Sequence, residues 1–299
     1  MNTVNEPQIN WGGSWTEIKL EAFEKYVNAY LSIMNKQKVK YNGWPTTIYF
    51  DGFAGSGTRI SLSTNEENTL FADFLISEDL EVYKGSAERV LSLTQKFDNY
   101  LFVDNDKQSI DSLEKKLKEK SITNNNCHFV FDEVNAQLEK FSRIIDDKKA
   151  ALVLLDPFGM QIDWSSIEKL KDKRVDLWIL IPSGVIINRF LDRKGKLIFS
   201  SKLQSYFGMT EDEIRKKFYQ TETVETLFGS IDITKKVNDS IKIISELYIE
   251  KLKTVWQFVS AEPLKLYNTK NVPIFHFVFA SNNKTALKIA SQIIEKKNK

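Results

Sequence analysis

The chain has 299 residues, of which 42% are hydrophobic and 27% charged, and its 42 basic and 40 acidic residues give a net charge of +2. This is the composition of an ordinary globular protein that can form one large α/β domain, and any basic surface must be local because the total charge is balanced. The single cysteine, Cys127, excludes an internal disulfide and a cysteine-based metal cluster, and two histidines are too few for a histidine-rich metal site. No stretch approaches the length of a membrane span and no apolar leader region is evident, so we expect a cytoplasmic protein with no metal.

The N-terminal segment, residues 1–45, is expected to form a polar arm followed by one helix. Ser14 is a candidate N-cap for a helix from Trp15 to about Asn35, whose apolar residues recur at helical spacing. Trp15 and Lys19 lie four residues apart and therefore on the same helix face, which is typical of a packing helix.

A strand that runs into a glycine-rich turn spans residues 47–57. Its β-branched and aromatic residues predict a buried strand that ends at Asp51. Glycines in such a turn let a ligand approach the backbone, and an acid at the strand end suits the hydroxyl or ammonium groups of dinucleotides and S-adenosylmethionine (SAM). The residues expected to line this site are Asp51, Gly52, Phe53, Ala54, Gly55 and Gly57.

Other interpretations of this turn are weaker or remain open. A P-loop requires Gly-Lys-Ser/Thr, whereas Gly57 is followed by Thr58 and Arg59. The NAD fingerprint Gly-x-Gly-x-x-Gly is also absent, because the glycines stand at positions 52, 55 and 57. A tight turn without any ligand stays possible from this stretch alone.

Five predicted strands alternate with helices, and four of them end in an acidic residue. The alternation predicts βαβ units, and the nearly continuous apolar strands predict a parallel sheet with helices on both faces. The carboxyl ends of such strands lie at one edge, where ligands bind, so the four acids are candidates for one site. Each acid is alternatively a helix N-cap. The four residues are Asp51, Asp104, Asp132 and Asp156.

After residue 194 the strand–helix rhythm breaks. We expect a Rossmann-like core over 46–194, a helical insertion over 195–255, and a segment over 256–299 that completes the core with an antiparallel strand pair and a helix. Basic residues cluster near Phe190, Phe199, Tyr206 and Phe207 at the start of the insertion. This indicates either a nucleic-acid surface, with the charges on phosphates and the rings stacked on bases, or an ordinary solvated face over a small core. The four basic residues expected to bind substrate are Arg189, Arg193, Lys194 and Lys196.

These features resemble a class I SAM-dependent methyltransferase, whose sheet is mostly parallel with an antiparallel last strand. The resemblance implies that 51–57 binds SAM, that Asp104 holds its ribose and that Asp132 contacts its adenine. The pattern at 50–57, Gly85-Ser86 and Asp156-Pro157-Phe158-Gly159 is closer still to the three-Cys-motif partner family of bacteria and phages. That family is mostly known from its genomic pairing with a cysteine-motif protein, which is therefore an expected partner.

The resemblance also implies a chemistry for Asp156, Pro157 and Phe158. Enzymes that methylate exocyclic amines of nucleobases carry Asp/Asn-Pro-Pro-aromatic at this place, where a polar group accepts from the amine and the ring stacks on the base. Here Phe158 replaces the second proline and Gly159 the aromatic residue. Two functions are therefore expected: a methyltransferase acting on a base of RNA or DNA, or a methyltransferase-like scaffold with weak or no catalysis that serves a partner protein.

Overall fold

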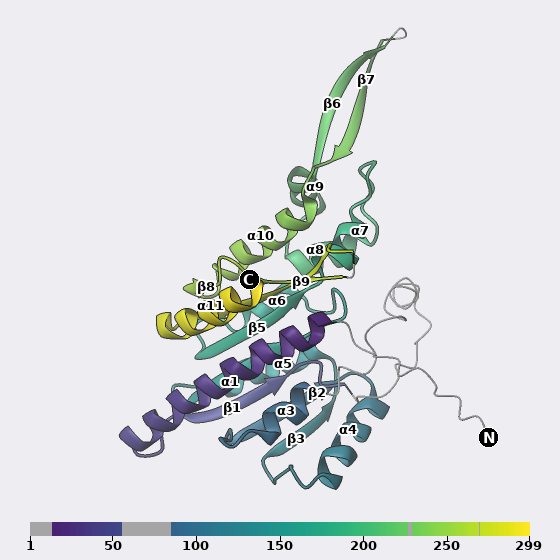
Figure 1. Cartoon of the computed structure of the whole chain (residues 1–299). Helices are drawn as coiled ribbons and strands as arrows, with labels where there is room; N and C mark the ends of the chain where they lie inside the picture. The colour runs from purple at the N-terminus through teal and green to yellow at the C-terminus, as the bar shows by residue number, and fades with distance from the viewer. Residues whose placement is uncertain (1–13, 56–84, 227–228, 269) are drawn as a thin grey trace, which may run out of the picture.

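The computed structural model describes residues 14–55, 85–226, 229–268 and 270–299 (Figure 1). Gly57 and the N-terminal arm 1–13, both part of the sequence predictions, lie outside these residues. Within the described ranges, no helix is both long and apolar enough to span a membrane.

In the described part of the chain, eight strands form one sheet in the order β3-β2-β1-β4-β5-β10-β8, with β9 also paired to β10. Strands β1 to β5 are mutually parallel, and β10 is antiparallel to β5. The predicted α/β fold, with a mostly parallel Rossmann-like sheet and an antiparallel last strand, is therefore confirmed. The strands are β1 (Thr46–Asp51), β2 (Asn99–Asp104), β3 (Cys127–Phe131), β4 (Lys149–Leu155), β5 (Val175–Ile181), β8 (Phe258–Val259), β9 (Leu264–Tyr267) and β10 (Pro273–Ser281).

Helices follow most strands and cover the sheet (Figure 1). They are α1 (Ser14–Lys40), α3 (Ser86–Ser92), α4 (Lys107–Glu119), α5 (Val134–Ile144), α6 (Trp164–Glu168), α7 (Asn188–Phe190), α8 (Ser200–Phe207), α9 (Glu211–Phe218), α10 (Ser240–Leu252) and α11 (Lys284–Asn298), with a π-helical turn at Ser183–Ile187 before α7.

Consecutive residues of β1 show that both faces of the sheet are covered. Side chains alternate between the two faces of a strand. The ring of Tyr49 lies 6.1 Å from that of Phe23 in α1, whereas the ring of Phe50 lies 4.8 Å from that of Phe141 in α5. Helices α1 and α5 therefore pack on opposite faces, which explains why β1 is buried along nearly its whole length.

Strand position in the sheet follows apolar content. Strand β4, the most apolar, lies between β1 and β5 and is buried from Ala150 onward. Strand β3 is at the edge, and its residues are only partly buried or exposed. Strand β4 ends beside the glycine turn, because the Gly52 amide donates to the Leu154 carbonyl at 3.0 Å.

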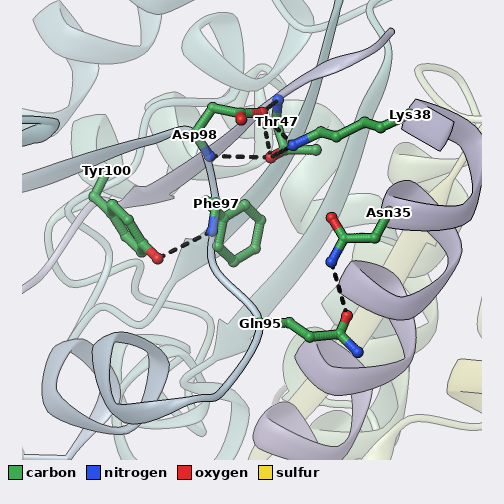
Figure 2. Close-up of polar contacts among 7 residues, drawn as sticks. All are labelled: Asn35, Lys38, Thr47, Gln95, Phe97, Asp98 and Tyr100. Atoms are coloured by element: carbon green, nitrogen blue, oxygen red, sulfur yellow. Dashed lines mark hydrogen bonds and ion pairs between the residues drawn. The ribbon is translucent and has the colours of Figure 1, made fainter. Parts of the chain in front are cut away.

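Helix α1 is fastened to the sheet near its C-terminal end. Lys38 Nζ lies 2.5 Å from Asp98 Oδ2, which also accepts from the Thr47 amide at 2.6 Å (Figure 2). One turn earlier, Asn35 donates to Gln95 at 3.1 Å. These contacts fix the helix against the start of β1 and the segment before β2.

The segment 195–255 differs in part from the predicted helical insertion. It contains α8, α9 and α10, but also an antiparallel ribbon of β6 (Tyr219–Thr226) and β7 (Gly229–Lys236) that projects from the rest of the chain (Figure 1). Val224 and Ile231 pair across the ribbon and are 37% and 51% exposed. The alternation of threonine and valine with acids in β6 favours a strand over a helix, and this is why the ribbon forms.

Candidate functional site

Asp51 lies beneath the glycine turn rather than on its surface. Its carboxylate is fully buried and accepts from Tyr49 Oη and Ser86 Oγ, each at 2.9 Å, and from the Phe53 amide at 3.3 Å. Burial, with a contribution from the nearby charge of Asp156, raises the pKa of Asp51 to about 6 although these hydrogen bonds oppose the change. Asp51 thus supports the turn through the Phe53 amide and joins it to α3 through Ser86.

The two described glycines of the turn are required for different reasons. A Cβ on Gly52 would lie 2.7 Å from Leu155 Cδ2 and 2.8 Å from Val134 Cγ2, so close packing against β4 and α5 excludes a side chain. Gly55 has a φ of +59°, a left-handed conformation that favours glycine. Packing explains the first glycine and backbone conformation the second.

Asp104 connects the end of β2 to the glycine turn. Asp104 Oδ2 accepts from the Gly55 amide at 2.8 Å, and Oδ1 accepts from the Asp106 amide at the same distance. The side chain is half-buried, and this burial, with the nearby acids Asp106 and Glu133, raises its pKa although the two amides lower it. Asp106, and not Asp104, caps α4. The Asp104 carboxylate is therefore held in place by two backbone amides, while the residue stays partly exposed.

The Asp132 side chain forms hydrogen bonds with α5, the helix that follows it in sequence. Its carboxylate accepts from Lys140 Nζ and Gln137 Nε2, each at 2.7 Å, and these bonds lower its pKa to about 2. Its backbone amide bonds the Asp104 carbonyl at 3.1 Å, which places both residues at one edge. The neighbouring Phe131 is 56% exposed and lies beside Asp104 in the strand register. Sequence reasoning missed Phe131, although an aromatic residue at an expected strand end was a usable signal.

Asp156 forms a buried ion pair that sequence reasoning did not foresee. Lys19 Nζ of α1 lies 2.6 Å from Asp156 Oδ2, and the two side chains are 2% and 7% exposed. The ammonium group also lies 5.4 Å from the centre of the Trp15 ring. The available signal was a lysine on the apolar stripe of α1, where a charged residue is unexpected.

The residues after Asp156 form a compact turn at the end of β4. Pro157 is buried and Phe158 half-buried, and the Gly159 amide donates to Gln161 Oε1 at 2.7 Å. Because β1 and β4 are adjacent and parallel, this turn and the glycine turn lie side by side at one edge. The structure thus brings together Asp51, the glycine turn, Asp104 and the Asp156 turn, with Asp132 at the far end of this edge.

The four predicted substrate-binding residues are exposed, and three lie on a short turn, residues 191–197, which we call the basic turn. Leu191 pairs with Leu197, and Gly195 has a φ of +89°. Carbonyl groups of the basic turn accept hydrogen bonds from Arg215, from Tyr219 Oη and from the Lys236 amide. Residues outside the turn therefore hold its backbone in place. The three side chains on it are Arg193, Lys194 and Lys196, while Arg189 belongs to α7.

The aromatic residues near this cluster do not form a stacking platform. Phe190 is 6% exposed, and Tyr206 and Phe207 are fully buried. Phe199, which is half-buried, packs its ring 4.9 Å from that of Phe190. The expectation that these rings stack on bases is therefore wrong, because they form the core that the basic turn covers.

A second buried polar pair lies at the end of β5. Ser183 Oγ and His276 Nδ1 are 2.6 Å apart, and both side chains are buried. Burial, helped by the charge of Lys265, lowers the pKa of His276 to about 4. A Cβ on Gly184 would lie 2.1 Å from the Pro273 carbonyl oxygen, so the chain after β5 touches the start of β10 directly.

No protein-family model and no curated protein matches this chain. Among solved structures, the chain is similar to a Legionella pneumophila protein described as DUF519, at 14% identity over 91% of this chain and 98% of that one, with a TM-score of 0.42. It is similar to an S-adenosylmethionine-dependent methyltransferase from Clostridium acetobutylicum, at 10% identity over 87% and 92%, with a TM-score of 0.33. A third structure is the plantazolicin methyltransferase BamL in complex with a triazolic desmethylPZN analog and SAH, at 11% identity over 90% and 88%, with a TM-score of 0.30. These values assign the chain to no family, and its fold class rests on the strand order described above.

Proposed function

We propose that this protein is a SAM-dependent methyltransferase that acts on a nucleic-acid base. The observation that carries the proposal is the shared edge of β1, β2 and β4, where the glycine turn, the Asp104 carboxylate and the Asp156 turn meet. In an open α/β sheet of order 3-2-1-4-5 the ligand site lies outside these strand ends.

The chemistry of the described residues fits SAM. Asp104 is fixed by two backbone amides and half-exposed, so its carboxylate is available to the hydroxyl groups of a ribose. Asp132 and the exposed ring of Phe131 would hold the adenine, and the backbone of 53–55 the remaining part of the molecule. When bound, SAM supplies an electrophilic methyl group on a sulfonium sulfur, which becomes a neutral thioether once the carbon–sulfur bond breaks.

Asp156, Pro157 and Phe158 would form the acceptor end of the site. A carboxylate or carbonyl that accepts from an amino group directs the nitrogen lone pair toward the methyl carbon, and the amino group releases its proton to water. Pro157 fixes the backbone that carries these acceptors. Phe158 supplies an apolar ring against which a base can lie.

The basic residues support a nucleic acid as the acceptor. Arg189, Arg193, Lys194 and Lys196 are exposed and follow β5, whose C-terminal end lies at the same edge as the candidate site. A basic turn with a fixed backbone suits phosphate groups that flank a target base.

Single-turnover transfer from labelled SAM to total RNA and to DNA tests the proposal. We expect Asp156→Ala to retain SAM binding, measured by calorimetry, and to lower the transfer rate by about 10²- to 10⁴-fold. Wild-type rates in this variant place the chemistry elsewhere. Absence of SAM binding by the wild-type protein refutes the function altogether.

A partner-dependent role is the second candidate, and the β6–β7 ribbon favours it. Within the described residues no further strand pairs with either edge of the ribbon, and Val224 and Ile231 are exposed, which is typical of a surface that another protein covers. The partner we propose is a three-Cys-motif protein. Tight SAM binding without transfer by the isolated protein, and transfer once the partner is added, is the result that favours this role.

A further inference from the structure

The Lys19–Asp156 pair joins two segments that are 137 residues apart in sequence. Lys19 belongs to α1 and Asp156 follows β4, so only the tertiary fold brings them together. Removing two charges from water costs more than an ion pair usually regains, and well-packed apolar residues often stabilise a protein as well or better. Stability alone therefore does not explain a lysine and an aspartate that are both buried at this point.

The surroundings of Lys19 fix its position independently of Asp156. The Trp15 ring, over which the Lys19 ammonium lies, packs on Phe275 of β10 with 5.0 Å between ring centres. In the middle of α1, Tyr26 Oη donates to Asp176 of β5 at 2.6 Å. The helix is thus fixed to the sheet at several points, and the lysine is presented to the end of β4 by a rigid element.

The Lys19 ammonium group reduces the repulsion between two carboxylates of the site. Asp51 and Asp156 follow adjacent strands, and the charge of Asp156 contributes to the raised pKa of Asp51. A cation at Asp156 Oδ2 offsets this repulsion and holds that oxygen in place, because a charge-assisted hydrogen bond of 2.6 Å is short and strong. The direction of the second oxygen is then set by α1 as well as by the β4 turn.

We propose that Lys19 is a positioning residue for the acceptor end of the site, which it serves by holding the Asp156 carboxylate oriented toward an amine substrate. The inference rests on the proposed function. It extends the site beyond the strand ends to a helix that precedes the glycine turn in sequence.

The test is a double-mutant cycle on the single-turnover rate, with total RNA and DNA as acceptors. Lys19→Met and Asp156→Asn should each lower the rate by about 10²-fold, and the double variant should be no slower than either single variant. Lys19→Arg, which keeps a cation, should recover part of the rate. SAM affinity, measured by calorimetry, should stay at the wild-type value in all four proteins.

Lys38→Met is the matched control, because it removes another ion pair that a lysine of α1 forms with an aspartate, about 28 Å away along the helix. It should lower the unfolding midpoint without lowering the rate. The unfolding midpoint also shows whether each variant is folded, and the double variant should be more stable than Lys19→Met since its aspartate charge is gone.

Two outcomes overturn the inference alone: a wild-type rate in folded Lys19→Met, or single-variant effects that multiply in the double variant. Failure of the wild-type protein to transfer a methyl group to any acceptor overturns the proposed function and this inference with it. The two failures are therefore distinguishable.

Discussion

The pH dependence of stability should reveal His276 and Asp51 as two buried groups with opposite effects. The pKa of His276 is lowered from 6.5 to about 4 by burial, so below pH 6.5 the unfolded chain binds a proton that the folded protein does not. Unfolding is therefore favoured as pH falls, by up to about 3 kcal/mol at 1.36 kcal/mol per pH unit. The stability from the neutral histidine is complete above pH 6.5 and is lost between pH 6.5 and 4.

Asp51 changes the stability of the folded protein in the opposite direction as pH falls. Burial raises its pKa from 3.8 to about 6, so below pH 6 the folded protein binds a proton that the unfolded chain does not. The folded state is therefore favoured as pH falls from 6 to 3.8, again by up to about 3 kcal/mol. In the wild-type protein the two contributions nearly cancel, and only variants separate them.

The assay is urea unfolding of His276→Gln, Asp51→Asn and the wild-type protein at pH 7.5 and pH 4.5 at one ionic strength. Relative to the wild type, His276→Gln should gain about 2 to 3 kcal/mol between pH 7.5 and pH 4.5, and Asp51→Asn should lose about 2 kcal/mol. Differences from the wild type remove the contributions of the other acids. The control is His128→Gln at an exposed position of β3. A His276→Gln difference no larger than that of the control, or the same sign for both buried variants, refutes the reasoning.

Three further outcomes are expected. Asp104→Ala should weaken SAM binding by about 10²- to 10⁴-fold in calorimetry, because two hydrogen bonds to a carboxylate are lost, and unchanged affinity contradicts the ribose assignment. Gly184→Ala should lower the unfolding free energy by about 1–3 kcal/mol, because its Cβ would meet the Pro273 carbonyl at 2.1 Å, and a neutral substitution in urea unfolding shows that the two segments are not in contact. Charge reversal of the basic residues should flatten the salt dependence of nucleic-acid binding by roughly 0.9 log units per lost phosphate contact with duplex DNA, and a wild-type salt slope argues against this surface. The residues to reverse are Arg189, Arg193, Lys194 and Lys196.

The sequence by itself determined the fold class and the edge at which the site lies. Short apolar runs that alternate with amphipathic stretches are local properties, and they predicted β1 to β5 and the antiparallel pair of β9 and β10. The carboxyl ends of parallel strands share one edge, so the positions of Asp51, Asp104 and Asp156 followed from strand ends alone.

Only the tertiary structure decided what each of these acids touches. Asp51 is buried under Tyr49 and Ser86, and Asp104 holds Gly55, because the segments that supply these partners are brought together by the sheet and α3. Lys19 reaches Asp156 across 137 residues, and no local pattern encodes that distance. Likewise, whether an aromatic side chain next to a basic cluster faces solvent or the core depends on which helices cover it. Packing of distant segments decides this, and it is why Tyr206 and Phe207 are core residues while Phe131 is exposed.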